Sequence, residues 1–268
     1  MIAENAPAKL NLALHVRRRR DDGYHELETV FAFCQHGDEL HIEFAPQSSL
    51  TITGPFAAGL SDEGDNLVTR AVAAFDATFG TSRPVTITLD KRLPVASGIG
   101  GGSADAAATL RAMARLHDVV GDPRLFSCAE RLGSDVPACL LGVSATGTGR
   151  GEKLVPVSIP RGVPTLLVNP GVSVSTAAVF QRWDGIDRGA MPSDPCAGRN
   201  DLQAPATALA PVIDDVITAI QDGASFARMS GSGATCFALY DSVAARDAAS
   251  TRIRGTHPDW WCLETALA

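Results

Sequence analysis

The feature that most constrains this chain is a glycine-rich segment between two regular elements. Residues 93–105 read Leu-Pro-Val-Ala-Ser-Gly-Ile-Gly-Gly-Gly-Ser-Ala-Asp, with a strand-like stretch at 85–89 before them and an alanine-rich run of helix formers at 104–116 after them. Backbone N–H groups converge on an anion where no Cβ intervenes, and a helix N-terminus adds partial positive charge. The segment therefore predicts a phosphate cradle.

Two familiar phosphate-binding motifs do not fit this segment. A Walker loop places Lys and then Ser or Thr after its last glycine, whereas Gly102 is followed by Ser103 and Ala104. A dinucleotide fingerprint that starts at Gly98 requires glycine or alanine where Ser103 stands. The alternative without a ligand is a glycine-rich turn, which would lose backbone entropy with no compensating interaction.

The bulk composition is that of an ordinary globular protein. The 268 residues are 45% apolar and 20% charged, which fits one large or two small domains and excludes disordered and fibrous classes. The net charge of −7 gives no general attraction for phosphate polymers, so nucleic acid is not an expected partner. The basic run 17–20 is followed at once by Asp21 and Asp22, a pattern typical of a solvated turn.

Cysteine spacing and hydropathy indicate a cytoplasmic protein. The six cysteines are at least eleven residues apart and mostly lie in apolar stretches, which predicts reduced, buried thiols and neither a disulfide framework nor a zinc site. No apolar run approaches the roughly 20 residues that span a membrane, and no basic segment precedes an apolar core at the N-terminus. We therefore expect no membrane partner.

The order of the predicted elements favours an α+β fold over a doubly wound sheet, because strands come first and helices later. Alternating residues predict strands over 10–16, 26–33, 40–44, 50–53, 85–89 and 165–168. Helices are predicted from 67 to Gly80, and over 104–116, 123–132, 175–183 and 202–220, the last interrupted near Pro205 and Pro211. A final pair of strands is predicted on either side of a turn at 230–233.

Three separated motifs, in order along the chain, resemble those of the GHMP kinases. They are Pro-Ala-Lys-Leu-Asn-Leu at 7–12, the glycine-rich segment 94–106, and Gly-Ser-Gly-Ala-Thr at 231–235. Gly-Tyr-His-Glu-Leu at 23–27 and Gly-Ser-Asp-Val-Pro at 133–137 resemble one branch of that family, whose substrate carries cytidine diphosphate. The likeness extends over nearly the whole chain. Ile99 and Ala104 depart from the commoner leucine and second serine, but they leave the glycines intact.

The resemblance implies a two-domain fold with the active site in the cleft between the domains. The N-terminal domain, residues 1–157, would be ribosomal protein S5 domain 2-like, and the C-terminal domain, residues 158–268, would be ferredoxin-like α+β. The implied reaction moves the γ-phosphoryl group of ATP to the 2-hydroxyl of CDP-methylerythritol, in the non-mevalonate route to isoprenoid precursors. Mg²⁺ is the implied second cofactor, with no protein ligand predicted for it. We expect a monomer or a weak homodimer.

Lys9 and Asp135 are the candidate catalytic residues. Phosphoryl transfer needs an aligned hydroxyl, a group that takes its proton, and positive charge near the transferred phosphate. Lys9 interrupts an apolar strand, where a buried ammonium is costly unless it meets an anion. The resemblance makes Asp135 the general base and Lys9 the residue that keeps it ionised. From the residues alone, Asp135 could instead be a helix N-cap and Lys9 an exposed edge-strand residue.

The candidates on the nucleotide side also come from the resemblance. It assigns the adenine pocket to Asp65, Asn66 and Lys91. The triphosphate contacts would come from Pro94, Ser97, Gly98, Ile99, Gly100, Gly101, Gly102 and Ser103. The turn at 231–235 would close over this segment and support it, and the alternative is a hairpin with a purely structural role.

The substrate candidates are Asn11, Tyr24, His25, Asp135, Thr176 and Phe180. Tyr24 can lie flat on a base, and His25 can hydrogen-bond a pyrimidine edge; the resemblance places both at the cytidine end. Asn11 shares a strand face with the candidate catalytic lysine. Thr176 and Phe180 are one helical turn apart and match a polar and an aromatic contact beside the base. A structural His25 and a core Phe180 are the alternatives.

Two other functions stay open at this point. The first is another GHMP kinase, acting on homoserine, mevalonate or a sugar. Tyr24 and His25 speak against it, because a substrate without a base has no use for an aromatic and histidine pair. The second is a catalytically silent nucleotide-binding regulator, which would be marked by loss of Lys9 or Asp135, and both residues are present.

Overall fold

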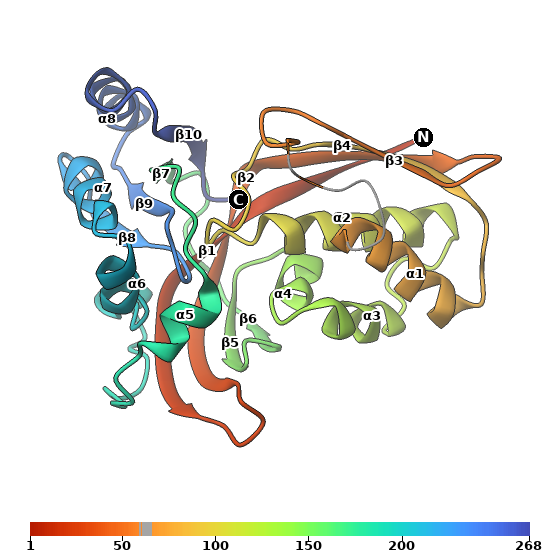
Figure 1. The fold of residues 1–268 in the computed structure, drawn as a ribbon, viewed down its shortest axis with the longest axis horizontal. Coiled ribbons are helices and arrows are strands. Elements are labelled where there is room, and N and C mark those ends of the chain that lie inside the picture. The colour runs from red at the N-terminus through yellow and green to blue at the C-terminus, as the bar shows by residue number, and fades with distance from the viewer. Residues whose placement is uncertain (59, 61–65) are drawn as a thin grey trace. The chain divides into compact units, whose positions relative to one another are not determined.

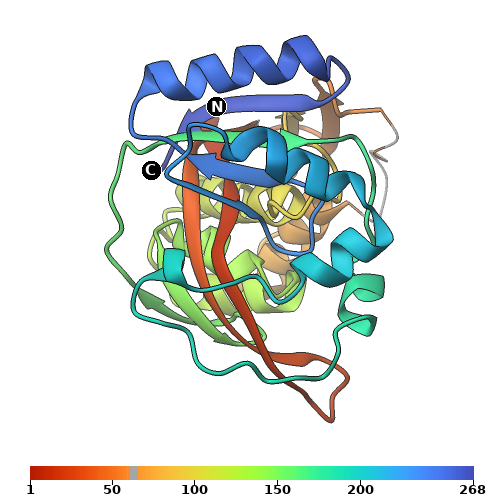
Figure 2. The ribbon, with the colours of Figure 1, turned by 90° about the vertical axis from the view of Figure 1, so that its left-hand side faces the viewer.

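The computed structural model describes residues 1–58, 60 and 66–268 (Figures 1 and 2). The chain forms two compact units, which we describe one at a time. The first comprises Met1–Ala8, His36–Val95 and Gly100–Gly142, and the second comprises Lys9–Gln35, Ala96–Ile99 and Val143–Ala268. Strands β1 (Ile2–Arg19) and β2 (His25–Phe44) therefore contribute one end to each unit.

In the first unit, a mixed sheet joins the end of β2 to β4 (Val85–Asp90) and β3 (Ser49–Thr53). β2 and β4 are antiparallel, and β3 runs parallel to β4. The described residues of this unit form four helices, and Figure 1 shows them gathered together: α1 (Leu67–Phe79), α2 (Gly101–Leu116), α3 (Arg124–Leu132) and α4 (Val136–Leu141).

Local sequence explains where these helices begin and end. The Asn66 side chain caps α1 by accepting a hydrogen bond of 2.9 Å from the Val68 N–H, and Gly80 ends the helix in the left-handed conformation. α2 is rich in alanine and is buried on most of its circumference, because small side chains let its neighbours approach closely. The helix that we predicted from residue 104 begins at Gly101, since the last glycines of the segment already form its first turn.

β2 corrects the prediction of two separate strands at 26–33 and 40–44, because it runs unbroken through the residues between them. Gln35 and His36 are both exposed, and this pair shifts the alternation of buried and exposed residues. The shift makes one long strand look like two. Gly37 follows, where a Cβ would overlap the carbonyl oxygen of Ala6 in β1, so glycine is required for this close approach.

The second unit contains a four-stranded antiparallel sheet in the order β10 (Trp261–Ala266), β7 (Pro164–Asn169), β9 (Cys236–Leu239), β8 (Phe226–Met229). Helix α7 (Val212–Gln221) connects β7 to β8, and α8 (Val243–Thr256) connects β9 to β10. This β-α-β-β-α-β order is that of the ferredoxin-like fold, as expected for the C-terminal part of the chain. Figure 1 shows both helices on the same side of the sheet.

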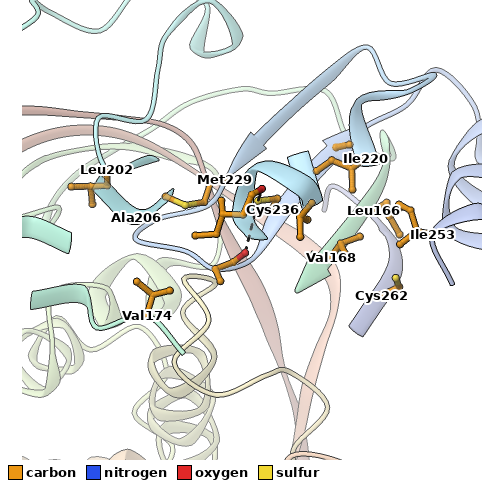
Figure 3. Packing of buried hydrophobic residues seen from close by; sticks show 14 of the residues in the cluster. Leu166, Val168, Val174, Leu202, Ala206, Ile220, Met229, Cys236, Ile253 and Cys262 are labelled. Carbon is orange, nitrogen blue, oxygen red and sulfur yellow. Dashed lines mark hydrogen bonds between the residues drawn. The ribbon is translucent and has the colours of Figure 1, made fainter. Parts of the chain in front are cut away.

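One apolar core holds this sheet and its helices together (Figure 3). From α7, Ile213, Val216 and Ile220 recur on one helical face and are fully buried. Leu166 of β7 and Ile253 of α8 contribute to the same core. Each side chain of this size contributes about 1.5–3 kcal/mol on burial, so the core is sufficient to fix the layer of helices on the sheet.

The remaining elements of the second unit lie beside the first part of β2 or after β7. β5 (Ala145–Gly149) pairs antiparallel with β2, and β6 (Lys153–Pro156) pairs with β5. Three short helices follow β7: α5 (Thr176–Gln181), the 3₁₀ helix η1 (Pro195–Ala197) and α6 (Gln203–Leu209).

The predicted helix over 202–220 is two helices, α6 and α7, separated at Pro211. Pro205 does not interrupt α6, because it lies in the first turn, where a missing N–H has no intrahelical acceptor. Sequence periodicity missed α4, α8, β5, β6 and β10. β5 contains glycine at 147 and 149, which dilutes its strand pattern.

The six cysteines are free thiols, and all except Cys196 are buried, which agrees with the predicted burial. Among the residues that the structure describes, no helix is both long enough and apolar enough to cross a membrane.

Candidate active site

The glycine-rich segment ends directly in the N-terminus of α2. Gly98 and Gly100 both have positive φ, of 79° and 67°, and Gly100 is the N-cap of α2. The first intrahelical hydrogen bond runs from the Ala104 N–H to the Gly100 carbonyl at 2.8 Å, so the N–H groups of Gly101 and its two successors precede the helical ladder. A 16-residue helix with such a start presents N–H donors and partial positive charge to an anion.

In the second unit, the turn between β8 and β9 packs on the start of this segment. The Ser230 hydroxyl donates to the Gly98 carbonyl at 3.0 Å, and the Thr235 N–H donates to the Ser97 carbonyl at 3.1 Å. A Cβ on Gly98 would lie 2.5 Å from the Ser230 carbonyl oxygen and 2.8 Å from the Gly233 nitrogen. The turn therefore supports the glycine-rich segment, as the resemblance implied.

Lys9 is buried in β1 with only 2% of its surface exposed, so the alternative of an exposed edge-strand lysine is wrong. Its ammonium donates to the Asn11 side-chain oxygen at 2.8 Å and lies 5.2 Å from the centroid of the Phe31 ring. Its backbone N–H donates to the Ile99 carbonyl at 2.9 Å. The strand that carries Lys9 is thus hydrogen-bonded directly to the glycine-rich segment.

Asn11 extends this contact into a chain of buried polar groups. Its Nδ2 donates to the Thr29 hydroxyl at 2.8 Å, and that hydroxyl donates to the Ala13 carbonyl at 2.7 Å. Its backbone N–H donates to Ser230 Oγ at 3.2 Å. Because Thr29 fixes which end of the amide carries the NH₂ group, the amide oxygen of Asn11 faces Lys9. The ammonium of Lys9 is therefore held in one position.

Asp135 belongs to the first unit, in the short connection between α3 and α4. It stands at the N-cap position of α4, with φ −90° and ψ −15°, but its side chain makes no capping hydrogen bond. The carboxylate is partly exposed. Asp135 therefore occupies the position that the helix-cap alternative predicted, but its side chain does not make the hydrogen bond that defines a cap.

Within the second unit, His25 and Phe180 come together, as the prediction of a common substrate pocket requires. The two rings stack with centroids 4.7 Å apart, and the Trp183 ring meets His25 edge-on at 5.6 Å. Burial lowers the pKa of His25, and the charge of Arg19 lowers it further. The imidazole is then neutral at pH 7, with one donor and one acceptor nitrogen.

Sequence reasoning missed Trp183. Its signal was available, because it follows Phe180 by three residues just beyond the end of α5 and so falls on the same side as that ring. Tyr24 is not part of this aromatic group: its ring is 52% exposed and lies 4.8 Å from the Arg150 guanidinium. Thr176 lies one helical turn before Phe180 in α5, with its hydroxyl 2.8 Å from that of Ser232 in the supporting turn.

The predicted adenine pocket is only partly visible. Asp65 lies outside the described residues, and the Asn66 side chain caps α1. Lys91 is 97% buried, and its ammonium donates to Asp105 Oδ2 at 2.7 Å and to Asp38 Oδ2. Burial would lower the pKa of Lys91, but the two carboxylates outweigh it and raise that pKa. Sequence reasoning missed both acids: Asp105 stands alone in an alanine-rich run, whereas Asp38 lies in a polar stretch beside Glu39.

The other residues predicted to contact phosphate differ in how exposed they are. Pro94, Ser97 and Ile99 are buried. Gly102 is exposed, and Ser103 is partly exposed in the first turn of α2. Among residues 1–58, 60 and 66–268, no three His, Cys, Asp or Glu side chains gather as a metal site would require.

Comparison with known proteins agrees with these features. The model of the GHMP kinases N terminal domain matches residues 66–143, and that of the GHMP kinases C terminal domain matches residues 190–257. A 4-diphosphocytidyl-2-C-methyl-D-erythritol kinase of Rhizorhabdus wittichii is 52% identical, over 98% of this chain and 94% of its own length. One of Novosphingobium aromaticivorans is 48% identical, over 99% and 93%.

Solved structures give the same result at the level of the fold. The crystal structure of a 4-(cytidine 5'-diphospho)-2C-methyl-D-erythritol kinase superposes with a TM-score of 0.84 at 35% identity, and covers 100% of this chain and 99% of its own. A homoserine kinase from Cytophaga hutchinsonii, at 19% identity and a TM-score of 0.73, shares the fold. The chain belongs to the GHMP kinases, in the family of the 4-diphosphocytidyl-2-C-methyl-D-erythritol kinases.

Proposed function

We propose that this chain transfers the γ-phosphoryl group of ATP to the 2-hydroxyl of 4-diphosphocytidyl-2-C-methyl-D-erythritol. The products are the 2-phosphate and ADP, and the reaction is a step of the non-mevalonate route to isoprenoid precursors. The observation that carries the proposal is the buried ammonium of Lys9, which is fixed by Asn11 on a strand hydrogen-bonded to the glycine-rich segment. About half of the residues are identical to those of the two named relatives, and this sequence identity supports the choice of substrate.

The glycine-rich segment and the start of α2 bind the polyphosphate in this proposal. The N–H groups at the start of the helix donate to phosphate oxygens, and the helix dipole favours their charge. The absence of side chains at Gly100, Gly101 and Gly102 lets the backbone approach the phosphates closely. Asn66 serves the adenine side by fixing the start of α1.

Lys9 and Asp135 act on the acceptor hydroxyl. The carboxylate of Asp135 takes the proton of the hydroxyl as the new oxygen–phosphorus bond forms. The ammonium of Lys9 favours the ionised form of that carboxylate and stabilises negative charge on the transferred group. Asn11 orients the ammonium, because its amide oxygen accepts one of the three N–H bonds.

The aromatic group of His25 and Phe180 binds the cytidine end of the substrate. A neutral imidazole offers a pyrimidine edge both a donor and an acceptor, and the stacked ring offers a flat apolar face. Tyr24 and Thr176 complete the substrate contacts in the proposal. Tyr24 is exposed enough to lie on a base, and Thr176 carries its hydroxyl at the start of α5.

Magnesium enters this proposal with the nucleotide. The described residues offer no cluster of acidic side chains for it, which fits an ion held mainly by phosphate oxygens and water. Such an ion neutralises charge on the β- and γ-phosphates. We assign no protein ligand to it.

The remaining expectations concern the organisation of the chain. We propose a domain boundary near residue 157, a cytoplasmic location, and a monomer or weak homodimer in solution. Light scattering behind a sizing column, over a tenfold range of protein concentration, distinguishes a monomer from a weak dimer.

The test of the proposed function is release of ADP from MgATP by the purified protein. The acceptors are 4-diphosphocytidyl-2-C-methyl-D-erythritol, homoserine, mevalonate and galactose. We expect turnover with the first alone. Turnover with another acceptor would support a kinase but contradict the cytidine site. No turnover with any of the four acceptors would favour a nucleotide-binding regulator.

A further inference from the structure

Three charged side chains are buried together in the first unit, and we call them the charged triad: Asp38, Lys91 and Asp105. Their exposed fractions are 0%, 3% and 3%. The Lys91 ammonium donates to Asp105 Oδ2 at 2.7 Å and to Asp38 Oδ2. Asp38 Oδ1 accepts the backbone N–H groups of Arg92 at 2.6 Å and Leu93 at 2.8 Å. Lys91 is thus fixed from both sides.

The position of the charged triad in the chain ties it to the phosphate-binding segment. Lys91 stands two residues before that segment, and Asp105 is the last residue of the segment, in α2. The ion pair between them therefore closes residues 92–104 into a loop, and Asp38 attaches the base of this loop to β2.

Gly101 connects the loop to the triad directly. A Cβ on Gly101 would lie 3.1 Å from Lys91 Nζ and 3.7 Å from Asp38 Oδ2. The backbone at the start of α2 therefore packs against the ammonium, which a side chain at this position would disturb. The orientation of the first N–H groups of α2 depends on where that ammonium lies.

The charges of the triad do not balance. Two carboxylates share one ammonium, and Asp105 Oδ1 is buried without a hydrogen-bond partner among the described residues. Burial raises the pKa of Asp105 to about 7, with Lys91 opposing the rise and Asp38 adding to it. If Lys91 turned to a ligand, it would leave two buried carboxylates facing each other, which is strongly unfavourable. We therefore expect the Lys91 ammonium to stay with the two carboxylates in the interior when a ligand binds.

We propose that Lys91, held by Asp38 and Asp105, is a positioning residue that closes the base of the phosphate-binding loop, and that its ammonium makes no contact with the nucleotide. The inference rests on the proposed function only in taking ATP as the ligand. It limits any part of Lys91 in the predicted adenine pocket to atoms other than the ammonium.

Opening the base of this loop should affect the binding of the nucleotide and not the binding of the second substrate. A closed loop already holds its N–H groups in the orientation that binds polyphosphate, whereas an opened loop must be ordered at the moment of binding. Opening the base of the loop should weaken ATP binding. It should leave the binding of the second substrate unchanged, because that site depends on His25 and Phe180.

The experiment compares two substitutions at one position with a control one helical turn away. Asp105→Ala removes the closing ion pair, while Asp105→Asn keeps an oxygen to accept from Lys91. The control is Thr109→Val, which removes the buried hydrogen bond from the Thr109 hydroxyl to the Asp105 carbonyl without touching the triad. Calorimetry measures the affinity of each protein for a non-hydrolysable ATP analogue and, separately, for the cytidine substrate.

We expect Asp105→Ala to lower the affinity for the ATP analogue about tenfold or more, because the loop must then be ordered on binding. The affinity for the cytidine substrate should fall by less than about twofold. Asp105→Asn should restore most of the analogue affinity, and Thr109→Val should leave it unchanged while lowering the melting temperature. If Asp105→Ala fails to fold, Asp38→Asn tests the same point, since it weakens the other carboxylate link that holds the Lys91 ammonium at the base of the loop.

Three results would overturn the inference: unchanged analogue affinity in Asp105→Ala, equal weakening of both ligands, or an equal loss in Thr109→Val. A wild-type protein that fails to bind the ATP analogue at all would instead contradict the proposed function. The two failures are therefore distinguishable.

Discussion

Two of the three lysines in this chain are buried, and they are held in different ways. Lys9, in the second unit, donates to the neutral amide oxygen of Asn11 and lies over the ring of Phe31. Lys91, in the first unit, lies between the carboxylates of Asp38 and Asp105. The third lysine, Lys153, is exposed on β6.

The difference separates two uses of a buried charge. The amide oxygen of Asn11 orients the Lys9 ammonium in a buried position, which suits a role toward the oxygens of a reacting phosphate. Carboxylate partners cancel the charge and turn it into a structural link, so Lys91 suits a role within the fold. The same residue type near the same glycine-rich segment is therefore expected to serve chemistry in one unit and loop geometry in the other.

The largest effect is expected on stability when the structural lysine is neutralised. Lys91→Met leaves two buried carboxylates without a cation, which should lower the free energy of unfolding by about 3–5 kcal/mol. Urea denaturation at pH 7 measures it, with Lys153→Met as the exposed control, expected within about 0.5 kcal/mol of wild type. A mild effect of Lys91→Met would mean that the triad is not a tight ionic link.

Lys9→Met should produce the opposite pattern, with lost turnover and a retained fold. Removing a cation that stabilises transition-state charge costs about 10²–10³ in kcat. Steady-state ADP release and a thermal melt on the same preparation separate the two effects. Were the fold lost and the residual turnover per folded molecule normal, Lys9 would belong with Lys91 as a structural lysine.

A smaller effect is expected at the aromatic group that accompanies Lys9 in the second unit. His25→Ala removes the ring stacked on Phe180 and its two hydrogen-bonding nitrogens, so KM for the cytidine substrate should rise about tenfold. KM for ATP should stay within about twofold, since the substitution leaves the phosphate-binding loop intact. Equal increases in both KM values would show that the loop at residues 23–25 is structural.

The last prediction concerns how stability depends on pH. Because the pKa of Asp105 is raised to about 7, the folded state keeps a proton that the unfolded chain loses above pH 4. This contribution to stability is present below pH 4 and is lost as pH rises through 7. Asp105→Asn cannot titrate, so urea midpoints measured from pH 4 to 8 should fall less steeply for the variant. Parallel curves for the two proteins would contradict the shifted pKa.

Sequence reasoning succeeded where the chemistry lies in consecutive residues. Four glycines between a strand and an alanine-rich run identified the phosphate-binding segment, and a lysine in an apolar strand identified Lys9. The ferredoxin-like order of the second unit also agreed with expectation, because its core helix α7 has a clear apolar face. Strong local patterns of this kind predict structure well, because they depend little on residues distant in sequence.

The parts that were missed depend on residues distant in sequence. Asp38 lies 53 residues before Lys91, and no periodicity or motif connects the two. Asp105, an acid in an alanine-rich run, signals only that some partner exists, and the fold alone decides which one. The unbroken course of β2 was missed for a different reason, since its exposed Gln35 and His36 interrupt the alternation on which strand prediction depends.

The measurement that tests the account most directly is the Asp135→Asn variant, assayed for binding and turnover together. Calorimetry gives the affinities for an ATP analogue and for 4-diphosphocytidyl-2-C-methyl-D-erythritol, and ADP release gives kcat. The account predicts that both affinities stay within about threefold of wild type while kcat falls by about 10² or more, as for a lost general base. Near-normal turnover in Asp135→Asn would contradict the assignment of Asp135, and with it the proposed pairing of Asp135 with Lys9.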